Sequence, residues 1–266
     1  MRAPRSKTMV LWGIVWFNLI CLGLPTVIVL AASFTAGEIV TFPPDGLSLR
    51  WYERLWERSE FVDAFLRSLW VAAVCTAIAI PVGTLAAIAM VRFRLRFLTA
   101  IQVYLLLPFT IPLIVSGIGL MLIFGEVRIL GQLWPVGVAA CVINLPFMIW
   151  AVSASVNALD PDLELAAASC GAPPLQVFLT VTLPAVLPGV ISGALLMFIL
   201  AFNEFIVSLL LVDARIVTLP VSIYNSIRSV ITPDLAAVSV VYIVVAVVAI
   251  WLLDRLVSLD IFLKSK

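Results

Sequence analysis

Glu204 and its neighbour Asn203 are the polar pair in this chain best placed to do chemistry, because they lie inside a long apolar run, 185–212. In a helix over that run, Glu204 would lie about 8 Å from the centre, still at hydrocarbon depth. A carboxylate there is costly, so it usually faces a cavity, a partner charge or a transport pathway. A carboxylate beside an amide favours a cationic solute, and both residues are candidates for a translocation pathway. The alternative, that Glu204 is protonated or paired with an Arg of this or a second chain, stays open.

Enzymatic and metal chemistry find little support in the residue types. The chain has no His, which removes the commonest general base and the commonest transition-metal ligand. Its cysteines are scattered without a C-x-x-C pair, and we interpret all four as structural: Cys21, Cys75, Cys141 and Cys170. No G-x-x-x-x-G-K-S/T phosphate loop occurs, so the chain does not by itself hydrolyse ATP in the usual manner. We expect no catalytic residues, no metal and no cofactor.

Composition indicates an integral membrane protein. Hydrophobic residues make up 64% and charged residues 12% of the 266 residues, and the mean hydropathy is +1.21. A helix needs about 20 apolar residues to cross a bilayer. Six stretches reach that length: 10–32, 64–91, 98–124, 133–156, 185–212 and 235–258. We expect an all-α integral membrane fold with six transmembrane helices in a single domain over 1–266; the net charge of +1 gives no support to a nucleic-acid partner.

The placement of Lys and Arg near the span ends predicts the orientation. Nine of the 16 fall on one side: Arg2, Arg5, Lys7, Arg92, Arg94, Arg96, Arg255, Lys264 and Lys266. We therefore predict that both termini are cytoplasmic. The first apolar run is longer than the core of a signal peptide, so we interpret it as a retained helix. By parity the 157–184 segment is also cytoplasmic, although it contains no Lys or Arg.

The 157–184 segment carries the local signals of two short helices. Asp160 is a suitable N-cap, Pro161 suits the first helical position, and Gly171 can end the helix. Pro174 then belongs to the start of a second helix. A helix of about ten residues is marginal alone, so it must pack on something. Two alternatives follow from the residues: packing on the chain's own transmembrane helices, or docking on another protein.

A motif within this segment is distinctive. It consists of Glu164-Leu-Ala-Ala-Ala-Ser-Cys-Gly171-Ala172, followed by Phe178, Val181, Leu183-Pro184 and Pro188-Gly189. This pattern resembles the Glu-Ala-Ala loop of type I ABC importer permeases. In that family the loop forms a coupling helix that inserts into a groove of the cytoplasmic ATPase. The resemblance implies that Ala166, Ala167 and Gly171 make that contact here.

One position departs from the family motif. Aligned on Gly171, the place usually held by the motif's Glu is Leu165, and the nearest carboxylate, Glu164, lies one residue earlier. One residue corresponds to about 100° around a helix. Whether Glu164 takes over the polar contact with the ATPase is therefore left open by the sequence.

The resemblance also implies a function and partners. It extends over most of the chain from the second span onward. The run from Asn203 through Thr218-Leu-Pro220 to Thr232-Pro-Asp234 resembles the spermidine, putrescine and opine branch. It implies a permease subunit of the bacterial inner membrane that forms half of an alternating-access pathway for a small polar or cationic solute such as a polyamine or opine. The implied partners are an ATPase dimer, a homologous second permease, a substrate-binding protein and membrane lipid.

Two further alternatives are open at this point. A secondary transporter or channel would need no ATPase, although the paired inverted repeats of many such proteins are missing. The predicted external segment, 213–234, has helix-like spacing of apolar residues and carries Arg215 and Arg228. It is either a contact surface for the binding protein or an amphipathic helix that rests on lipid headgroups.

Overall fold

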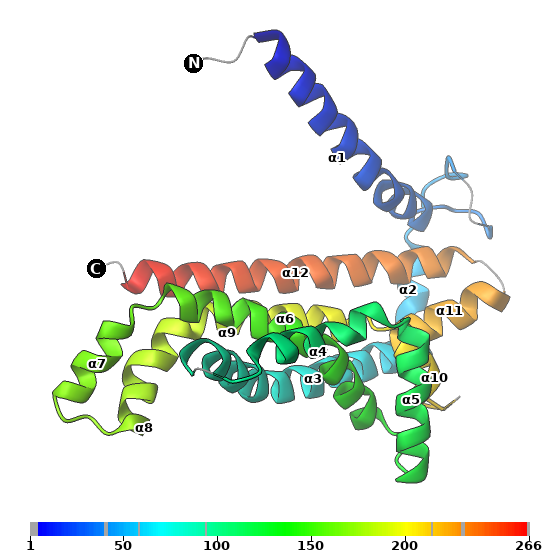
Figure 1. Cartoon of the computed structure of the whole chain (residues 1–266). Helices are drawn as coiled ribbons and strands as arrows, with labels where there is room; N and C mark the ends of the chain where they lie inside the picture. Colours follow the sequence, from blue (N-terminus) through cyan, green and yellow to red (C-terminus); the bar gives the residue numbers. More distant parts are fainter. Residues whose placement is uncertain are drawn as a thin grey trace. The chain divides into compact units, whose positions relative to one another are not determined.

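The computed structural model describes residues 5–39, 42–57, 59–93, 95–213, 215–229 and 232–264. The regular elements of these residues are helices, which confirms the predicted all-α fold (Figure 1). They are α1 (Arg5–Ser33), α2 (Arg50–Glu57), α3 (Ser59–Arg92), α4 (Leu98–Thr110), α5 (Leu113–Glu126), α6 (Leu133–Ala158), α7 (Pro161–Ser169), α8 (Pro174–Val177), the π-helical turn η1 (Phe178–Thr182), α9 (Leu183–Phe202), α10 (Ile206–Leu211), α11 (Leu219–Ser229) and α12 (Pro233–Lys264).

Several of the cations used to predict the orientation lie outside the described residues. These are Arg2, Arg94 and Lys266, and the side chains of Arg5, Lys7, Arg255 and Lys264 are also outside the description. The predicted side of the membrane for each terminus therefore stays a prediction.

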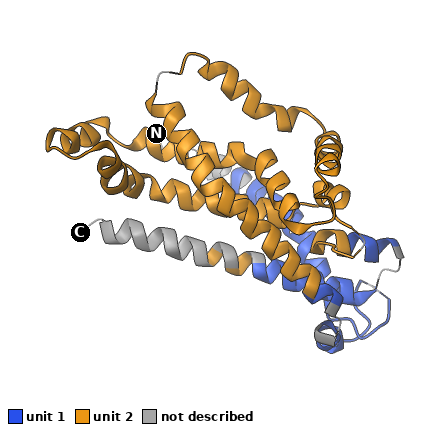
Figure 2. Ribbon diagram, turned by 90° about the horizontal axis from the view of Figure 1, so that it is seen from below, with its two compact units in different colours: residues 1–62, 223–245 blue, residues 63–222, 246–266 orange. Residues whose placement is uncertain are grey.

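The chain divides into two compact units (Figure 2). The first comprises residues 1–62 and 223–245, and the second comprises 63–222 and 246–266. The single transmembrane domain predicted over 1–266 stays a prediction. Both groups of predicted site residues belong to the second unit, so the site is described within that unit.

Polar contacts in the first unit hold the loop after α1 against α2. The hydroxyls of Ser33 and Tyr52 share a hydrogen bond of 2.6 Å. Trp51 Nε1 donates to the carbonyl of Thr35 at 2.9 Å, and the Arg50 guanidinium lies 4.5 Å from the centroid of the Trp51 ring. These buried and half-buried partners order a segment that composition alone describes only as a long charged loop.

Four helical segments among the described residues are long and apolar enough to cross a membrane. They are Leu11–Ser33, Glu60–Arg92, Leu133–Ala158 and Pro174–Phe202. Helices α4 and α5 pass the same test as a pair, but they are bent by 99° at their junction. The described apolar part of α12, Pro233–Val245, is shorter. The count of six spans therefore stays a prediction.

Two of the predicted spans are interrupted. Over 98–124 the helix stops at Ile111 and Pro112, because proline lacks an N–H and disfavours the helical conformation of the residue before it. Ile111 is accordingly extended, with a ψ of 135°. Over 185–212 the helix ends at Phe202 and resumes as α10. The structure corrects the expectation of one continuous helix at both places.

The core of the second unit contains the contact between α6 and α9, which lie side by side (Figure 1). Two glycines of α9 permit this approach. A Cβ on Gly189 would lie 2.8 Å from the carbonyl oxygen of Ala151, and one on Gly193 would lie 2.5 Å from Met148 Sδ. Small residues at such contacts let membrane helices approach closely.

A second buried cluster fixes α10 against its neighbours. It joins α3, α5, α6 and α10 through Val71, Phe124, Val136, Ala139, Ile143, Val207 and Leu211. The short helix after the break in the fifth predicted span is thus packed into the unit, and the break itself has a defined place beside it.

Candidate functional site

The predicted site residues lie at the two ends of α9. The 157–184 segment precedes this helix, and Asn203 and Glu204 follow it. A helix of 20 residues spans about 30 Å, so the structure does not bring the two groups together. They are two sites, and each is described separately.

The first helix of the 157–184 segment forms as its sequence predicts. Asp160 is the N-cap of α7, its Oδ1 accepting a hydrogen bond of 3.0 Å from the backbone N–H of Asp162, and Pro161 is the first helical residue. Gly171 has a φ of +91°, a conformation that glycine adopts without steric cost. Its N–H donates to the carbonyl of Ala168 at 3.0 Å and ends the helix.

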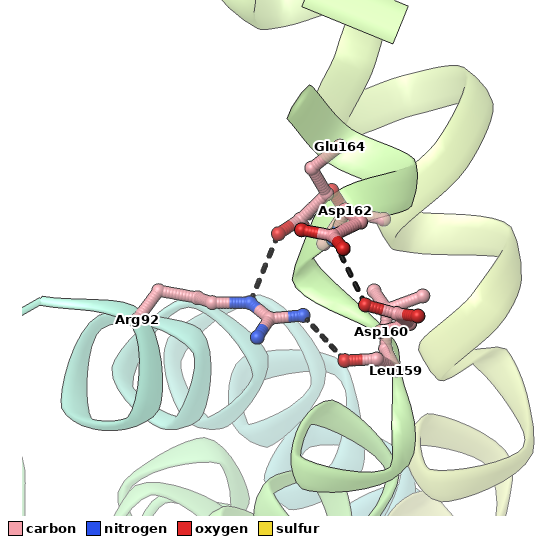
Figure 3. Close-up of polar contacts among 6 residues, drawn as sticks. Arg92, Leu159, Asp160, Asp162 and Glu164 are labelled. Atoms are coloured by element: carbon pink, nitrogen blue, oxygen red, sulfur yellow. Dashed lines mark hydrogen bonds and ion pairs between the residues drawn. The ribbon is translucent and has the colours of Figure 1, made fainter. Parts of the chain in front are cut away.

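Glu164 is bonded within the chain on both of its oxygens. Its Oε2 lies 3.0 Å from Arg92 Nε (Figure 3). Its Oε1 accepts a hydrogen bond of 2.6 Å from Thr182 Oγ1. The Arg92 Nε–H is not aligned for a hydrogen bond, so this contact is an ion pair held by charge. A second nitrogen of the same guanidinium, Nη2, donates to the carbonyl of Leu159 at 3.0 Å (Figure 3).

These contacts join four elements at one point. Arg92 is the last residue of α3, Leu159 is the C-cap of α6, Glu164 lies in α7, and Thr182 ends η1. The side chains of Arg92 and Glu164 are only 18% and 21% exposed, and Thr182 is buried. We call the four residues Arg92, Leu159, Glu164 and Thr182 the Arg92 junction. Partial burial makes this ion pair less screened by solvent than a pair on an open surface.

Several large apolar side chains of the segment are exposed. Leu165, at the position where the motif usually has Glu, is 63% exposed, and three further leucines are more than half exposed: Leu163, Leu175 and Leu179. Ala166 and Gly171 are exposed and Ala167 is half-buried. An exposed patch of this kind is typical of an interaction surface. The segment therefore has one carboxylate bonded to its own chain and several large apolar side chains left uncovered within it.

Glu204 lies at a helix end, not in the middle of a continuous span. Its Oε1 accepts a hydrogen bond of 3.0 Å from the backbone N–H of Val207, in the first turn of α10. Glu204 is half-buried, whereas Asn203 is exposed and donates through Nδ2 to the carbonyl of Ile199 at 2.9 Å. The predicted depth of Glu204 assumed an unbroken helix, so the break removes the basis of that estimate.

Sequence reasoning missed the partners of Glu164. Arg92 enters the sequence argument only as a cation that marks orientation, and neither Leu159 nor Thr182 is singled out. One signal was available: the 157–184 segment has carboxylates but no Lys or Arg, so any buried carboxylate in it needs a cation from elsewhere in the chain. Among the described residues, no group of three or more Cys, Asp or Glu is arranged to hold a metal ion.

The predicted helix within 213–234 is present as α11. The Arg228 guanidinium lies 5.7 Å from the centroid of the Tyr224 ring, and Arg215 is exposed. Their contact with a binding protein stays a prediction.

Comparison with known proteins gives a family and several relatives. The family model described as "Binding-protein-dependent transport system inner membrane component" matches residues 79–259. The putrescine transport system permease protein PotI of Escherichia coli (strain K12) is 29% identical over 249 residues, which cover 90% of this chain and 85% of PotI. The molybdenum transport system permease protein ModB of Mycobacterium bovis is 32% identical over 203 residues, covering 70% of this chain and 76% of ModB.

Solved structures resemble the fold. A chain of a bacterial ABC transporter involved in the import of the acidic polysaccharide alginate superimposes with a TM-score of 0.68 at 14% identity, over 96% of this chain and 98% of that one. A chain of the MetNI methionine ABC transporter in an inward-facing conformation gives a TM-score of 0.64 at 17% identity, over 78% and 98%. At these identities the likeness concerns the fold alone.

Proposed function

The chain belongs to the family of binding-protein-dependent transport system inner membrane components, and from that premise we propose that its 157–184 segment couples it to a cytoplasmic ATPase. As a member, it is a multi-pass inner-membrane permease of a binding-protein-dependent ABC importer. It is a non-catalytic subunit, and its sequence lacks a phosphate loop, so ATP hydrolysis falls to a partner.

One observation carries the proposal: the exposed apolar face of α7 and its surroundings. Leu163 and Leu165 project from a helix of nine residues, too short to be stable without support. Glu164, which lies between them in the sequence, connects this helix to the Arg92 junction. The exposed leucines, Ala166 and Gly171 supply an apolar surface that fits a groove on the ATPase. Ala167, which is half-buried, also belongs to this surface. Glu164 is bonded inside the chain, so Leu165 makes the central contact in its place.

The test is capture of the ATPase from native membranes by a tagged form of this chain. We expect an ATPase to copurify with the unmodified chain, and Ala167→Arg or Gly171→Arg to abolish its copurification and ATP-dependent uptake. The matched control is Ala100→Arg, which adds the same charge at another exposed helical alanine. Normal assembly and uptake in the Ala167 and Gly171 variants would overturn the coupling role.

The orientation and the remaining partners follow from the same proposal. An ATPase in the cytoplasm requires the 157–184 segment on that side, which also places both termini there if the chain crosses six times. The chain then forms half of a pathway that opens alternately to the two sides, with a homologous second permease as the other half. A substrate-binding protein docks on the opposite side, with Arg215 and Arg228 as contacts. Counting the subunits of the purified complex tests this composition.

The proposed solute is a small polar or cationic molecule such as a polyamine or opine, with a cation favoured. Relatives are named for putrescine and for molybdenum, so names alone do not choose between solutes. The half-buried carboxylate of Glu204, beside the amide of Asn203, favours a positively charged one. Uptake of labelled putrescine and molybdate by the complete system tests this choice. Molybdate uptake without putrescine uptake would contradict it, and uptake without ATP would indicate a secondary transporter or channel.

A further inference from the structure

We propose that Arg92 is a positioning residue that transmits movement of α7 to α3, α6 and α9 together. The inference rests on the proposed function, because α7 moves only if an ATPase drives it. Its basis is the Arg92 junction, in which one side chain is bonded to two other elements and is connected through Glu164 to a third.

The chemistry of the guanidinium suits this role. Arg92 directs Nε toward Glu164 and Nη2 toward the Leu159 carbonyl, both at 3.0 Å. The rigid planar group carries the ion pair to Glu164 at one edge and the hydrogen bond to Leu159 at another, so one guanidinium holds α7 near the end of α6. A Lys ammonium is a single point on a flexible stem and does not hold two acceptors in this fixed geometry.

Charge adds to the geometry. The 157–184 segment has no cation of its own, and Arg92 is the cation that the structure places against Glu164. Both side chains are about four-fifths buried, at 18% and 21% exposure. Pulling α7 away from the end of α3 would lose the attraction between the two charges, which is stronger at this burial than in open water, and this opposes separation. The pair therefore favours joint movement of the two elements.

The route along the backbone alone is less direct. From α7 the chain passes through a turn, α8 and the π-helical turn η1 before it reaches α9, and in η1 the N–H of Leu183 bonds to the carbonyl of Phe178, five residues back. Such turns are local irregularities in a helix and often occur at functional sites. The bond from Thr182 to Glu164 bypasses this path and connects α7 directly to the residue preceding α9. A push on α7 thus reaches α9 and α3 through side chains as well as through the backbone.

The experiment measures solute imported per ATP hydrolysed by the reconstituted complex. We expect Arg92→Gln and Glu164→Gln each to lower this ratio at least about threefold, the scale of coupling changes caused by single residues. The substitutions keep the exposed leucines, Ala166 and Gly171, so an ATPase should still copurify, and the ratio is measured on the assembled complex. The double variant should be no worse than the worse single variant, because both changes disable one junction. Arg96→Gln is the matched control. It removes an exposed Arg of the loop between α3 and α4, which lies over the Phe97 ring, and it should leave the ratio unchanged.

Arg92→Lys keeps the proposal testable if Arg92→Gln does not fold. It retains the charge, and we expect its ratio to fall between those of the unmodified chain and Glu164→Gln. A ratio equal to that of the unmodified chain in Arg92→Lys and in any folded Arg92→Gln would overturn the inference. That result differs from failure of the proposed function, in which no ATPase would copurify with the unmodified chain at all.

Discussion

Glu164 and Glu204 are both carboxylates near a helix start, but their surroundings differ. Glu164 is bonded to Arg92, 72 residues earlier in the sequence, and to Thr182 at the end of η1, 18 residues later. Glu204 is bonded to Val207, three residues away, and its hydrogen bond serves the helix that it precedes. The carboxylate of Glu164 joins separate elements, whereas that of Glu204 accepts a hydrogen bond from the first turn of the helix that follows it.

The difference shows how an apolar chain can use the same residue type for two purposes. A carboxylate paired across elements is part of the structure, because removing it leaves an opposing charge behind. A carboxylate that caps its own helix contributes less, since an amide or a hydroxyl can accept the same hydrogen bond. Its charge is then available for interaction with a solute. Variants of Glu164 should therefore affect stability more strongly, and variants of Glu204 should affect the affinity for the solute more strongly.

The largest expected effect is that of Glu164→Ala on stability. It leaves the Arg92 charge mostly buried without its partner, and we expect a loss of up to about 3 kcal/mol in the free energy of unfolding, the lower end for a buried pair because some exposure remains. Glu204→Ala should cost about 1 kcal/mol, the value of the one hydrogen bond that is lost with Val207. Denaturant titration of the purified chain in detergent measures both. Equal losses of unfolding free energy in the two variants would contradict the distinction between a carboxylate that joins separate elements and one with a local hydrogen bond.

The next effect is that of Thr182→Val, which keeps the shape of the side chain and removes its hydroxyl. The lost hydrogen bond is to a charged group and is partly buried, so we expect about 1.5 kcal/mol of destabilisation. Thr180→Val is the matched control, because Thr180 is exposed and donates to the carbonyl of Gln176 in its own turn. The same titration should show a change near zero for the control. A control change as large as that of Thr182→Val would assign the loss to the valine, not to the junction.

A smaller effect is expected for Asp160→Ala. This change removes the cap of α7 and should cost about 1 kcal/mol, confined to that helix. Hydrogen exchange should show faster exchange of the α7 amides, while those of α6 and α9 keep their rates. Faster exchange throughout α9 would mean that the Arg92 junction depends on the Asp160 cap, although the two share no hydrogen bond in the structure.

The local structure of the 157–184 segment could be predicted because its signals are local. The cap at Asp160, the proline after it and the left-handed glycine at Gly171 each act within a few residues. The orientation of Glu164 could not be predicted in this way. It depends on an arginine at the end of another helix, and a single sequence carries no direct sign of that pairing.

The breaks in the helices divide in the same way. The one at Pro112 has a backbone cause that is visible in the sequence, because proline disfavours the helical conformation of the residue before it. The break at Asn203 has no proline. It depends on α10 being packed by the cluster that contains Val207 and Leu211, and on a carboxylate that replaces the lost backbone acceptor. Tertiary packing of this kind is not visible in a hydropathy pattern.

The smallest effect on stability, and the sharpest test of the comparison, is that of Glu204→Gln. The amide oxygen can still accept the hydrogen bond from Val207, so only the favourable charge at the start of α10 is lost, about 0.3–0.5 kcal/mol. If Glu204 contacts a cationic solute, uptake of putrescine should nevertheless fall, through a higher KM, while copurified ATPase and its basal hydrolysis stay unchanged. Glu164→Gln should show the reverse pattern, with lower import per ATP and little change in KM. Unchanged affinity and rate in Glu204→Gln would remove Glu204 from the pathway and leave it a cap alone.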